Sequence, residues 1–278
     1  MESHVYGDCL MKLEKTVRPS LLPTVLCLTV MSPFSHTLAA ETGDWSVAVG
    51  GGVASLPRYP GSDQHKIVAI PIISVRYRQF FVGDAPGAGT PAGIGVFFHE
   101  DEHWKVGAAL GGDVYSTRKE RDDRQQLHGL GDIKGSARAG IFTSYTVDWF
   151  SVRGGAYSDI KHHQGATGTF EAVARYSPFD RLNLTAGPGV VFGNQRYVQT
   201  FFGVTAVQAQ NSGYPEYTPK AGLVLARFTL GANYKLSKRW GLGAAAAVGQ
   251  LQSDAGRSPI VRSRNQTIFG VFAIYKFL

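Results

Sequence analysis

Residues 167–176 read TGTFEAVARY, a stretch that divides into two alternating sets of side chains. One set includes Phe170 and Tyr176, and the other includes Glu171 and Arg175. In a strand, successive side chains point to opposite sides of the sheet, so this spacing produces one apolar and one charged face. Such a strand fits a barrel wall between lipid on the outside and a polar space on the inside.

The same period-two alternation recurs through the chain. Residues 221–234 (AGLVLARFTLGANY) put Val224 and Phe228 on one face and Arg227 and Thr229 on the other. We therefore predict an all-β fold, a closed antiparallel transmembrane β-barrel of about 12 strands. The expected strands are 45–55, 66–77, 79–83, 92–99, 103–115, 134–145, 149–160, 167–176, 182–193, 221–234, 240–251 and 265–277.

The connections between these strands alternate in length. Short turns are expected near 78, 100–102, 146–148, 177–181 and 235–239. Longer polar loops are expected at 56–65, 84–91, 116–133, 161–166, 194–220 and 252–264, with room for a short helix in the loop 194–220. Short turns of outer-membrane barrels face the periplasm, so this alternation also predicts the orientation of the chain.

Aromatic residues flank the expected short turns. The pairs are Tyr77 and Phe80, Phe98 and Trp104, Tyr145 and Trp149, Tyr176 and Phe179, and Tyr234 and Trp240, while Tyr275 and Phe277 close the chain. Such rings favour the boundary between lipid and water. The alternative is a soluble sandwich with aromatic residues at its strand ends, but recurrence at every short turn favours the membrane.

The first 40 residues have the layout of a secretory signal peptide. They run from the basic residues Lys12, Lys15 and Arg18 through the apolar run 21–31 to the small residues Ala39 and Ala40. This run is shorter than the ~20 residues of a spanning helix, which argues against an N-terminal anchor. We therefore expect a leader at 1–40, with Met11 as an alternative start, and a barrel at 41–278 in a bacterial outer membrane. Both cysteines, Cys9 and Cys27, lie in the leader.

The charge of the chain is positive but dispersed. The sequence has 28 Lys and Arg against 21 Asp and Glu, a net charge of +7. The basic residues form no patch interleaved with aromatic residues, so we expect no nucleic-acid partner.

The segment His99–His103 (HEDEH) matches the H-E-x-x-H zinc motif by letter. That motif holds a metal only on a helix, where the two histidines share one face. Strand-like residues precede and follow this segment, so we interpret it as a polar hairpin turn. We expect no metal and no cofactor.

A barrel hydrolase with a Ser–His site at the outer rim is a further alternative. The residues that could supply it are Ser116, His128, Ser158, Asp159, His162 and His163. Their spacing does not require a common site, so no catalytic residues are predicted.

The inner faces of the expected strands carry more basic than acidic residues. The basic set is Arg76, Lys105, Arg138, Arg153, Arg175, Arg227 and Lys276, and the acidic set is Asp113, Asp159 and Glu171. One interpretation is that these charges pair and fill a narrow lumen. The other is a basic periplasmic mouth that binds anionic partners or passes anions.

Three segments resemble the MipA/OmpV family of outer-membrane proteins. They follow the first strand, fill the loop 194–220 and precede the last strand. The residues that carry the resemblance are Pro57, Tyr59, Gly61, Ser62, Asp63, Tyr197, Phe202, Gly203, Val204, Ser212, Gly213, Tyr217, Ser258 and Pro259. The resemblance extends over the whole predicted barrel, although these segments lie in predicted external loops.

The resemblance implies a non-enzymatic scaffold in cell-wall assembly, which links a murein lytic transglycosylase to a penicillin-binding protein. Other members of the family are described as porin-like or as surface adhesins and antigens. A narrow porin-like channel and a surface adhesin therefore stay open as alternatives to the scaffold. The scaffold and the adhesin would act by binding and the channel by passing solutes, in each case with outer-membrane lipid around the barrel.

Overall fold

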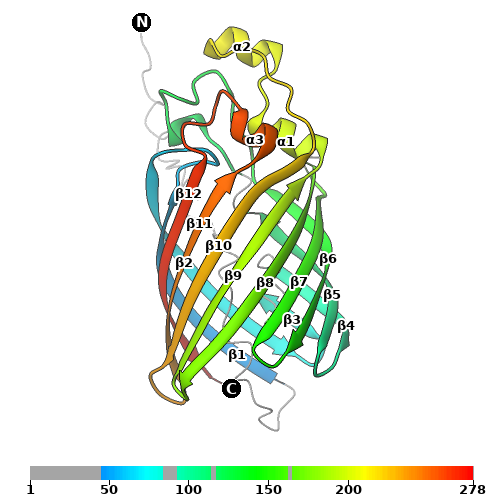
Figure 1. Ribbon diagram of the computed structural model, residues 1–278, viewed down its shortest axis with the longest axis vertical. Helices are drawn as coiled ribbons and strands as arrows, with labels where there is room; N and C mark the ends of the chain where they lie inside the picture. Colours follow the sequence, from blue (N-terminus) through cyan, green and yellow to red (C-terminus); the bar gives the residue numbers. More distant parts are fainter. Residues whose placement is uncertain (1–44, 84–92, 114–116, 162–164, 278) are drawn as a thin grey trace, which may run out of the picture.

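Twelve antiparallel strands close into a barrel (Figure 1). The computed structural model describes residues 45–83, 93–113, 117–161 and 165–277, so the predicted leader lies outside the described residues. The strands are β1 (Trp45–Pro57), β2 (His65–Tyr77), β3 (Phe80–Gly83), β4 (Gly93–Glu100), β5 (Trp104–Asp113), β6 (Ser136–Val147), β7 (Phe150–Asp159), β8 (Ala166–Phe179), β9 (Leu182–Gly193), β10 (Gly222–Lys235), β11 (Trp240–Leu251) and β12 (Asn265–Lys276). Each strand pairs with its neighbours in sequence, and β1 pairs with β12. The predicted fold class is confirmed.

The wall has the two faces that the alternation predicts. Phe170 and Tyr176 are 50% and 67% exposed on the outside of β8. On the inside of the same strand, Val173 is buried and Glu171 forms an ion pair with Arg227 of β10. A continuous outer belt of exposed apolar side chains suits lipid and not water.

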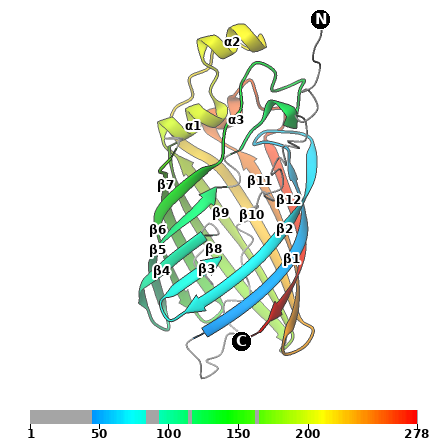
Figure 2. The ribbon, with the colours of Figure 1, turned by 180° about the vertical axis from the view of Figure 1, so that it is seen from behind.

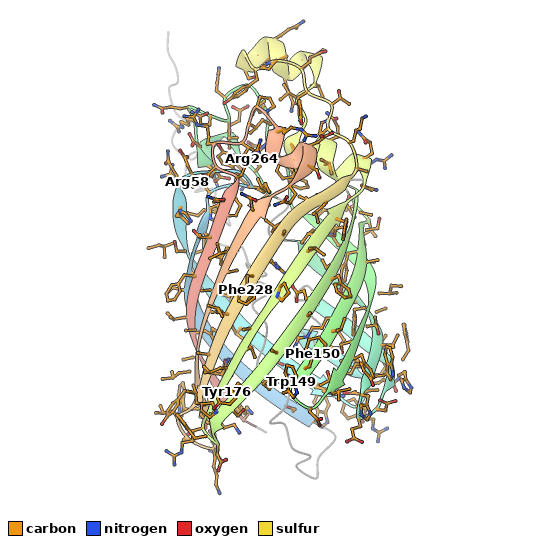
Figure 3. All side chains as sticks on the ribbon, in the orientation of Figure 1. Arg58, Trp149, Phe150, Tyr176, Phe228 and Arg264 are labelled. Atoms are coloured by element: carbon orange, nitrogen blue, oxygen red, sulfur yellow. The ribbon has the colours of Figure 1, made fainter. Side chains whose placement is uncertain are left out.

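Aromatic side chains mark one boundary of this belt. In Figure 3, Phe228 lies about half-way along the wall, whereas Trp149 and Tyr176 lie near the end that carries the short turns. At the same end, the rings of Trp240 and Tyr275 contact each other with their centroids 5.1 Å apart. Amphipathic rings are stable at this level because one edge meets water and the other meets lipid.

The upper end of β10 departs from the prediction. Alternation puts Val224 beside Phe228 on the outer face, but Val224 is 4% exposed and packs in the interior. The pairing of β10 with β9 shifts register between Leu223 and Leu225, which is a β-bulge. The extra residue of a bulge reverses the face of the sheet to which the following side chains point. A bulge leaves no mark in the period-two pattern of the sequence, so the pattern does not predict it.

The strands also differ in how far they pair. β1 and β2 pair from Trp45–Tyr77 to Pro57–His65, over thirteen residue pairs. β2 and β3 share three, because β3 has four residues. In the described part of the chain, no strand lies beside the first half of β2 on the β3 side.

The two ends of the barrel differ (Figures 1 and 2). Short turns join the strands at the end where β1 begins and β12 ends. The other end carries α1 (Gln195–Phe202), α2 (Ala206–Ser212), α3 (Ser253–Arg257) and the 3₁₀ turn η2 (Glu120–Asp122). The alternation of short and long connections is as predicted, and the loop 194–220 holds two helices where we expected room for one. None of the helices in the described residues is long and apolar enough to cross a membrane.

The HEDEH segment is a hairpin turn, as predicted, because β4 ends at Glu100 and β5 begins at Trp104. The Asp101 carboxylate accepts hydrogen bonds from the backbone N–H groups of Trp104 at 2.6 Å and His103 at 2.8 Å. These two bonds, and then His99, lower the pKa of Asp101 to about 2. The acidic group therefore stabilises the turn.

Across the described ranges, no three His, Cys, Asp or Glu side chains gather as a metal site would require.

The substitution Phe228→Arg tests whether this face meets lipid. An arginine near the bilayer midplane of such barrels costs ~2–4 kcal/mol, so the free energy of unfolding should fall by about that amount. The measurement is urea unfolding in phospholipid vesicles. The folded fraction at each urea concentration is read from the difference in gel mobility between boiled and unboiled protein. Phe228→Leu is the control and should unfold near the original midpoint. Equal midpoints for the Arg and Leu variants would contradict a lipid-facing wall.

Candidate functional site: the outer cap and the lumen

The long connections cover one mouth of the barrel and form what we call the cap, residues 58–64, 117–135, 194–221 and 252–264 (Figure 1). Two apolar clusters hold it. The first comprises Val198, Phe201, Phe202, Val224, Leu251 and Ala255, and the second comprises Tyr59, Leu127, Leu130, Val204 and Ile260. Each of these side chains is at most 5% exposed. Burial of a large apolar side chain contributes roughly 1.5–3 kcal/mol, so the cap is a packed unit and not a set of loose loops.

Several family-motif residues tie the cap together through hydrogen bonds. The buried Ser258 hydroxyl donates to the Phe202 carbonyl oxygen at 2.6 Å. The Tyr217 hydroxyl donates to the Asp254 carbonyl oxygen at 2.8 Å. Val204 and Tyr217 also exchange two backbone hydrogen bonds of 2.9 Å each. The two side-chain bonds join the region of α1 and α2 to the segment around α3, which is 56 and 37 positions away in sequence.

Two motif glycines adopt backbone conformations with positive φ. Gly61 has φ +97°, and a Cβ atom there would lie 2.7 Å from Cγ2 of Val261. Gly213 has φ +77° and ends α2 as a left-handed cap, with its N–H bonded to the Ala209 carbonyl oxygen. Both conformations are far cheaper for glycine than for a residue with a side chain. Gly203 ends α1 with an extended backbone.

The remaining motif residues, in the cap or at its border with β1, divide into buried and exposed ones. Pro57 and Ser62 are buried near the end of β1. Pro259 is partly buried, and the Ser212 hydroxyl donates to a carbonyl oxygen of its own helix at 2.6 Å. Asp63 is exposed.

Arg118 is a component of the cap that sequence reasoning missed. It is 2% exposed, and one of its guanidinium nitrogens donates to the Phe201 carbonyl oxygen at 3.1 Å. Burial lowers the pKa of Arg118 to about 10, so it stays cationic at neutral pH. No pattern in the sequence separates this arginine from the solvated arginines of the same loop, because its burial depends on packing against α1.

The lumen residues near the short turns form a compact ion cluster. Glu100 accepts from Lys105 at 2.8 Å and also pairs with Arg76. The Arg76 guanidinium lies 5.0 Å from the centroid of the Phe97 ring, and Lys105 Nζ lies 5.9 Å from it. Glu100 was not among the predicted lumen acids, because the HEDEH segment predicts only a turn there.

Higher in the lumen, two arginines have separate partners. Arg227 of β10 forms an ion pair with Glu171 of β8, across β9. Gly189 of β9 leaves room for this pair, because a Cβ atom at that position would lie 3.0 Å from Cγ of Glu171. The Arg138 guanidinium lies 5.9 Å from the ring centroid of Tyr197, a motif residue on α1. Through this contact, α1 connects the cap with the lumen wall.

The other predicted lumen charges are distributed around the wall. Arg153 and Asp159 are buried on β7. Arg175 on β8 and Lys276 on β12 are half-buried. The side chain of Asp113 lies outside the described residues. The seven basic residues thus belong to β2, β5, β6, β7, β8, β10 and β12, and they do not converge on one site.

Apolar side chains fill a further part of the lumen. Phe81, Phe97, Ala109, Phe142 and Tyr157 form a buried cluster inside β3 to β7. The centroids of its three phenylalanine rings are 5.2–6.0 Å apart. Packed rings narrow the space through which water or a solute could pass.

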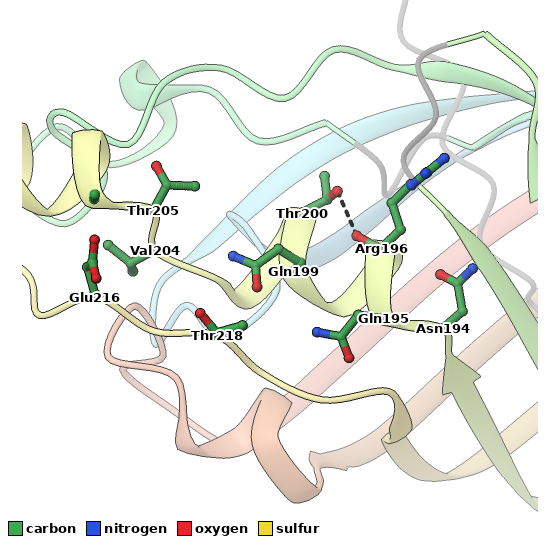
Figure 4. A pocket seen from close by; sticks show the side chains of 10 residues that line it. Asn194, Gln195, Arg196, Gln199, Thr200, Val204, Thr205, Glu216 and Thr218 are labelled. Atoms are coloured by element: carbon green, nitrogen blue, oxygen red, sulfur yellow. Dashed lines mark hydrogen bonds between the residues drawn. The ribbon is translucent and has the colours of Figure 1, made fainter.

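A cleft of about 990 Å³ opens between α1, α2 and the segment that follows α2 (Figure 4). Its lining includes Arg196, Gln199, Thr205 and Glu216. The Oε1 atom of Gln199 is buried without a hydrogen-bond partner. The cleft offers amide, hydroxyl and charged groups, but its lining holds no nucleophile paired with a base.

The residues suggested for a hydrolase do not assemble in the described chain. Ser158 is exposed and Asp159 is buried, because neighbouring residues of β7 point to opposite faces. His128 is exposed in the cap. Ser116, His162 and His163 lie outside the described residues.

The substitution Ser258→Ala tests whether the motif hydrogen bonds hold the cap. It removes the donor to the Phe202 carbonyl, and an unsatisfied buried group costs about 1–3 kcal/mol. Residues 195–212 should therefore exchange their amide hydrogens faster, by roughly one to two orders of magnitude, as measured by mass spectrometry. Ser263→Ala is the control, because its hydroxyl bonds at an exposed site. Identical exchange in both variants would rule out this role for Ser258.

Comparisons with known proteins agree with this architecture. The family model "MltA-interacting protein MipA" matches residues 49–277. The MltA-interacting protein of Escherichia coli (strain K12) is 23% identical over 255 residues, which cover 91% of this chain and 98% of that protein. The putative outer membrane protein YiaT of Escherichia coli O157:H7 is 20% identical over 229 residues, covering 82% and 89%.

A solved structure, the outer membrane channel DcaP of Acinetobacter baumannii, aligns at 9% identity and a TM-score of 0.39 over 86% of this chain and 99% of that one. A likeness this low carries no argument about function. The family match covers nearly the whole barrel and all four segments of the cap. This outer-membrane chain therefore belongs to the MltA-interacting protein MipA family.

Proposed function

We propose that this barrel is a non-enzymatic docking platform, which binds a murein enzyme at its periplasmic end. One observation carries the proposal. Two apolar clusters cover the outer mouth, while the opposite end presents charged residues on short, hydrogen-bonded turns. A molecule built to pass solutes would need the reverse, an open mouth above a clear lumen.

The periplasmic end has charges of opposite sign on its two halves. Asp101, Glu102 and Asp148 are exposed on the β4–β5 and β6–β7 turns. Lys238 and Arg239 are exposed on the β10–β11 turn. Charges in such an arrangement favour one orientation of a partner and raise its rate of association.

Backbone hydrogen bonds hold these turns in place. The Thr146 N–H donates to the His103 carbonyl oxygen at 2.8 Å, which joins the two acidic turns. The Lys276 N–H donates to the Arg239 carbonyl oxygen at 2.9 Å, which joins the basic turn to the end of β12. A preorganised surface loses little conformational entropy when a partner binds.

The name of the relatives supports the choice of partner. Proteins related to this chain are named for interaction with MltA. We therefore infer that the partner here is a lytic transglycosylase of that type. A link to a penicillin-binding protein is a further prediction from the family resemblance, and the two oppositely charged halves could serve one enzyme each.

Conductance measurements distinguish this proposal from a channel. In planar bilayers the original chain should show low and brief conductance, because the cap clusters lie across its mouth. Phe202→Asp puts a charge into a cluster where the side chain is 1% exposed, and it should raise the conductance several-fold. Val207→Asp is the control, since Val207 is 65% exposed on α2. A large, steady conductance of the original chain would favour the porin-like alternative.

Charge reversal tests the docking surface. Glu102→Lys and Lys238→Glu alter exposed charges on the two halves of the periplasmic end. At least one of them should slow association with a soluble MltA-type transglycosylase by roughly tenfold, with a weaker dependence on salt. The measurement is surface plasmon resonance with the barrel in nanodiscs.

Glu216→Lys in the cap is the matched control, because it makes the same change of charge at the other end. It should leave association unchanged. If Glu216→Lys slows association while neither periplasmic reversal does, the contact lies on the outer side and the proposal is wrong.

A further inference from the structure

We propose that the lipid-facing wall over β9–β12 and β1 contains a specific site for an anionic glycerophospholipid of the inner leaflet. The site is a groove for an acyl chain, with basic side chains for the phosphate at its foot. The proposal concerns the outside of the wall and does not depend on the docking of a murein enzyme.

The groove has a volume of about 730 Å³. It runs across β9, β10, β11, β12 and β1, from each strand to its hydrogen-bonded neighbour. Its lower edge is one continuous row of paired residues, formed by Leu182, Tyr234, Leu242, Ala273 and Gly51. Leu182 is the first residue of β9, at the rim, whereas Gly51 lies well inside β1. The groove therefore begins at the lipid–water boundary and rises into the membrane.

The upper edge is the next row of outward residues, formed by Ala232, Ala244, Val271 and Val53. Alanine in both rows and Gly51 in the lower row leave the floor low, while Leu242, Val271 and Val53 are 41–49% exposed beside it. A channel with an apolar floor and raised apolar sides suits a flexible hydrocarbon chain.

The foot of the groove is basic. Arg181 immediately precedes Leu182, and Lys238 and Arg239 lie on the turn between β10 and β11. All three side chains are exposed, and Asp180 is the acidic residue of these two turns. A cluster of this kind attracts anionic lipid by about 1 kcal/mol for each basic residue near the surface, or about fivefold in affinity.

Arg239 is fixed at the level where a phosphate would lie. A guanidinium nitrogen of Arg239 donates to the Tyr275 hydroxyl at 3.2 Å. Tyr275 pairs with Trp240, one outward row below the pair Leu242–Ala273. The guanidinium is thus held beside the interfacial rings and directly below the groove. Arginine in this position can bind two phosphate oxygens at once.

The charge also decides between a lipid and a second copy of the chain. A twofold interface brings the same surface of each copy together, so the basic foot of one copy would approach that of the other. A phosphate neutralises this charge, whereas a second copy adds to it. We therefore commit to the phospholipid.

Native mass spectrometry of the full barrel provides the test. The protein is released from nanodiscs that contain equal amounts of phosphatidylglycerol and phosphatidylethanolamine. We expect the original chain to retain phosphatidylglycerol in excess. Arg239→Gln should lower that retention about fivefold, and it lies outside the spanning part of the wall.

Ala244→Phe fills the groove and should abolish the retained lipid. Ala246→Phe is its control, because it makes the same change one outward row higher, beside Phe269 and outside the lining. The shift of mobility on boiling checks that each variant has folded.

Equal retention of the two lipids by the original chain would overturn the proposal. So would equal loss in the Ala244→Phe and Ala246→Phe variants. A dimer that dissociates with Ala244→Phe but not with Ala246→Phe would also overturn it, since the groove would then hold a second copy.

Discussion

The pairing of β1 with β12 is the constraint on which the rest of the molecule depends. Lipid offers no hydrogen bonds, so every backbone N–H and C=O within the wall needs a partner on another strand. The pairs from Ala48–Lys276 to Ser55–Phe269 satisfy this requirement where the first strand, β1, meets the last strand, β12. Closure also divides the side chains into an outer and an inner set, and it leaves the mouth as the place where irregular segments can pack away from lipid.

The cap and the lumen represent two different solutions for the interior. Near the short turns, Glu100 forms ion pairs with both Arg76 and Lys105, and these contacts stabilise charged groups inside the barrel. At the outer mouth, apolar packing around Phe202 replaces charge pairing, with Arg118 as the buried exception. The interior is therefore filled in two ways, by paired charges near the short turns and by apolar packing at the outer mouth.

The strands and their faces could be predicted from the sequence, because alternation such as Phe170–Glu171 follows directly from strand geometry. The folding of the motif residues around Tyr59 and Ser258 into one cap could not. Their proximity arises from contacts across about two hundred positions, such as the bond from Tyr59 to Ile260. Local periodicity contains no information on such contacts, nor on the bulge that turns Val224 inward. The leader and the functional role stay predictions.

The short β3 has a mechanical consequence. Within the described residues, three pairs join β2 to β3, whereas eight join β1 to β12 and thirteen join β1 to β2. Resistance to a sideways pull on two strands grows with the number of backbone hydrogen bonds that must break together. The circumference is therefore unevenly strong. A lateral force would part the wall between β2 and β3 before it separated β1 from β12, the strands that close the barrel.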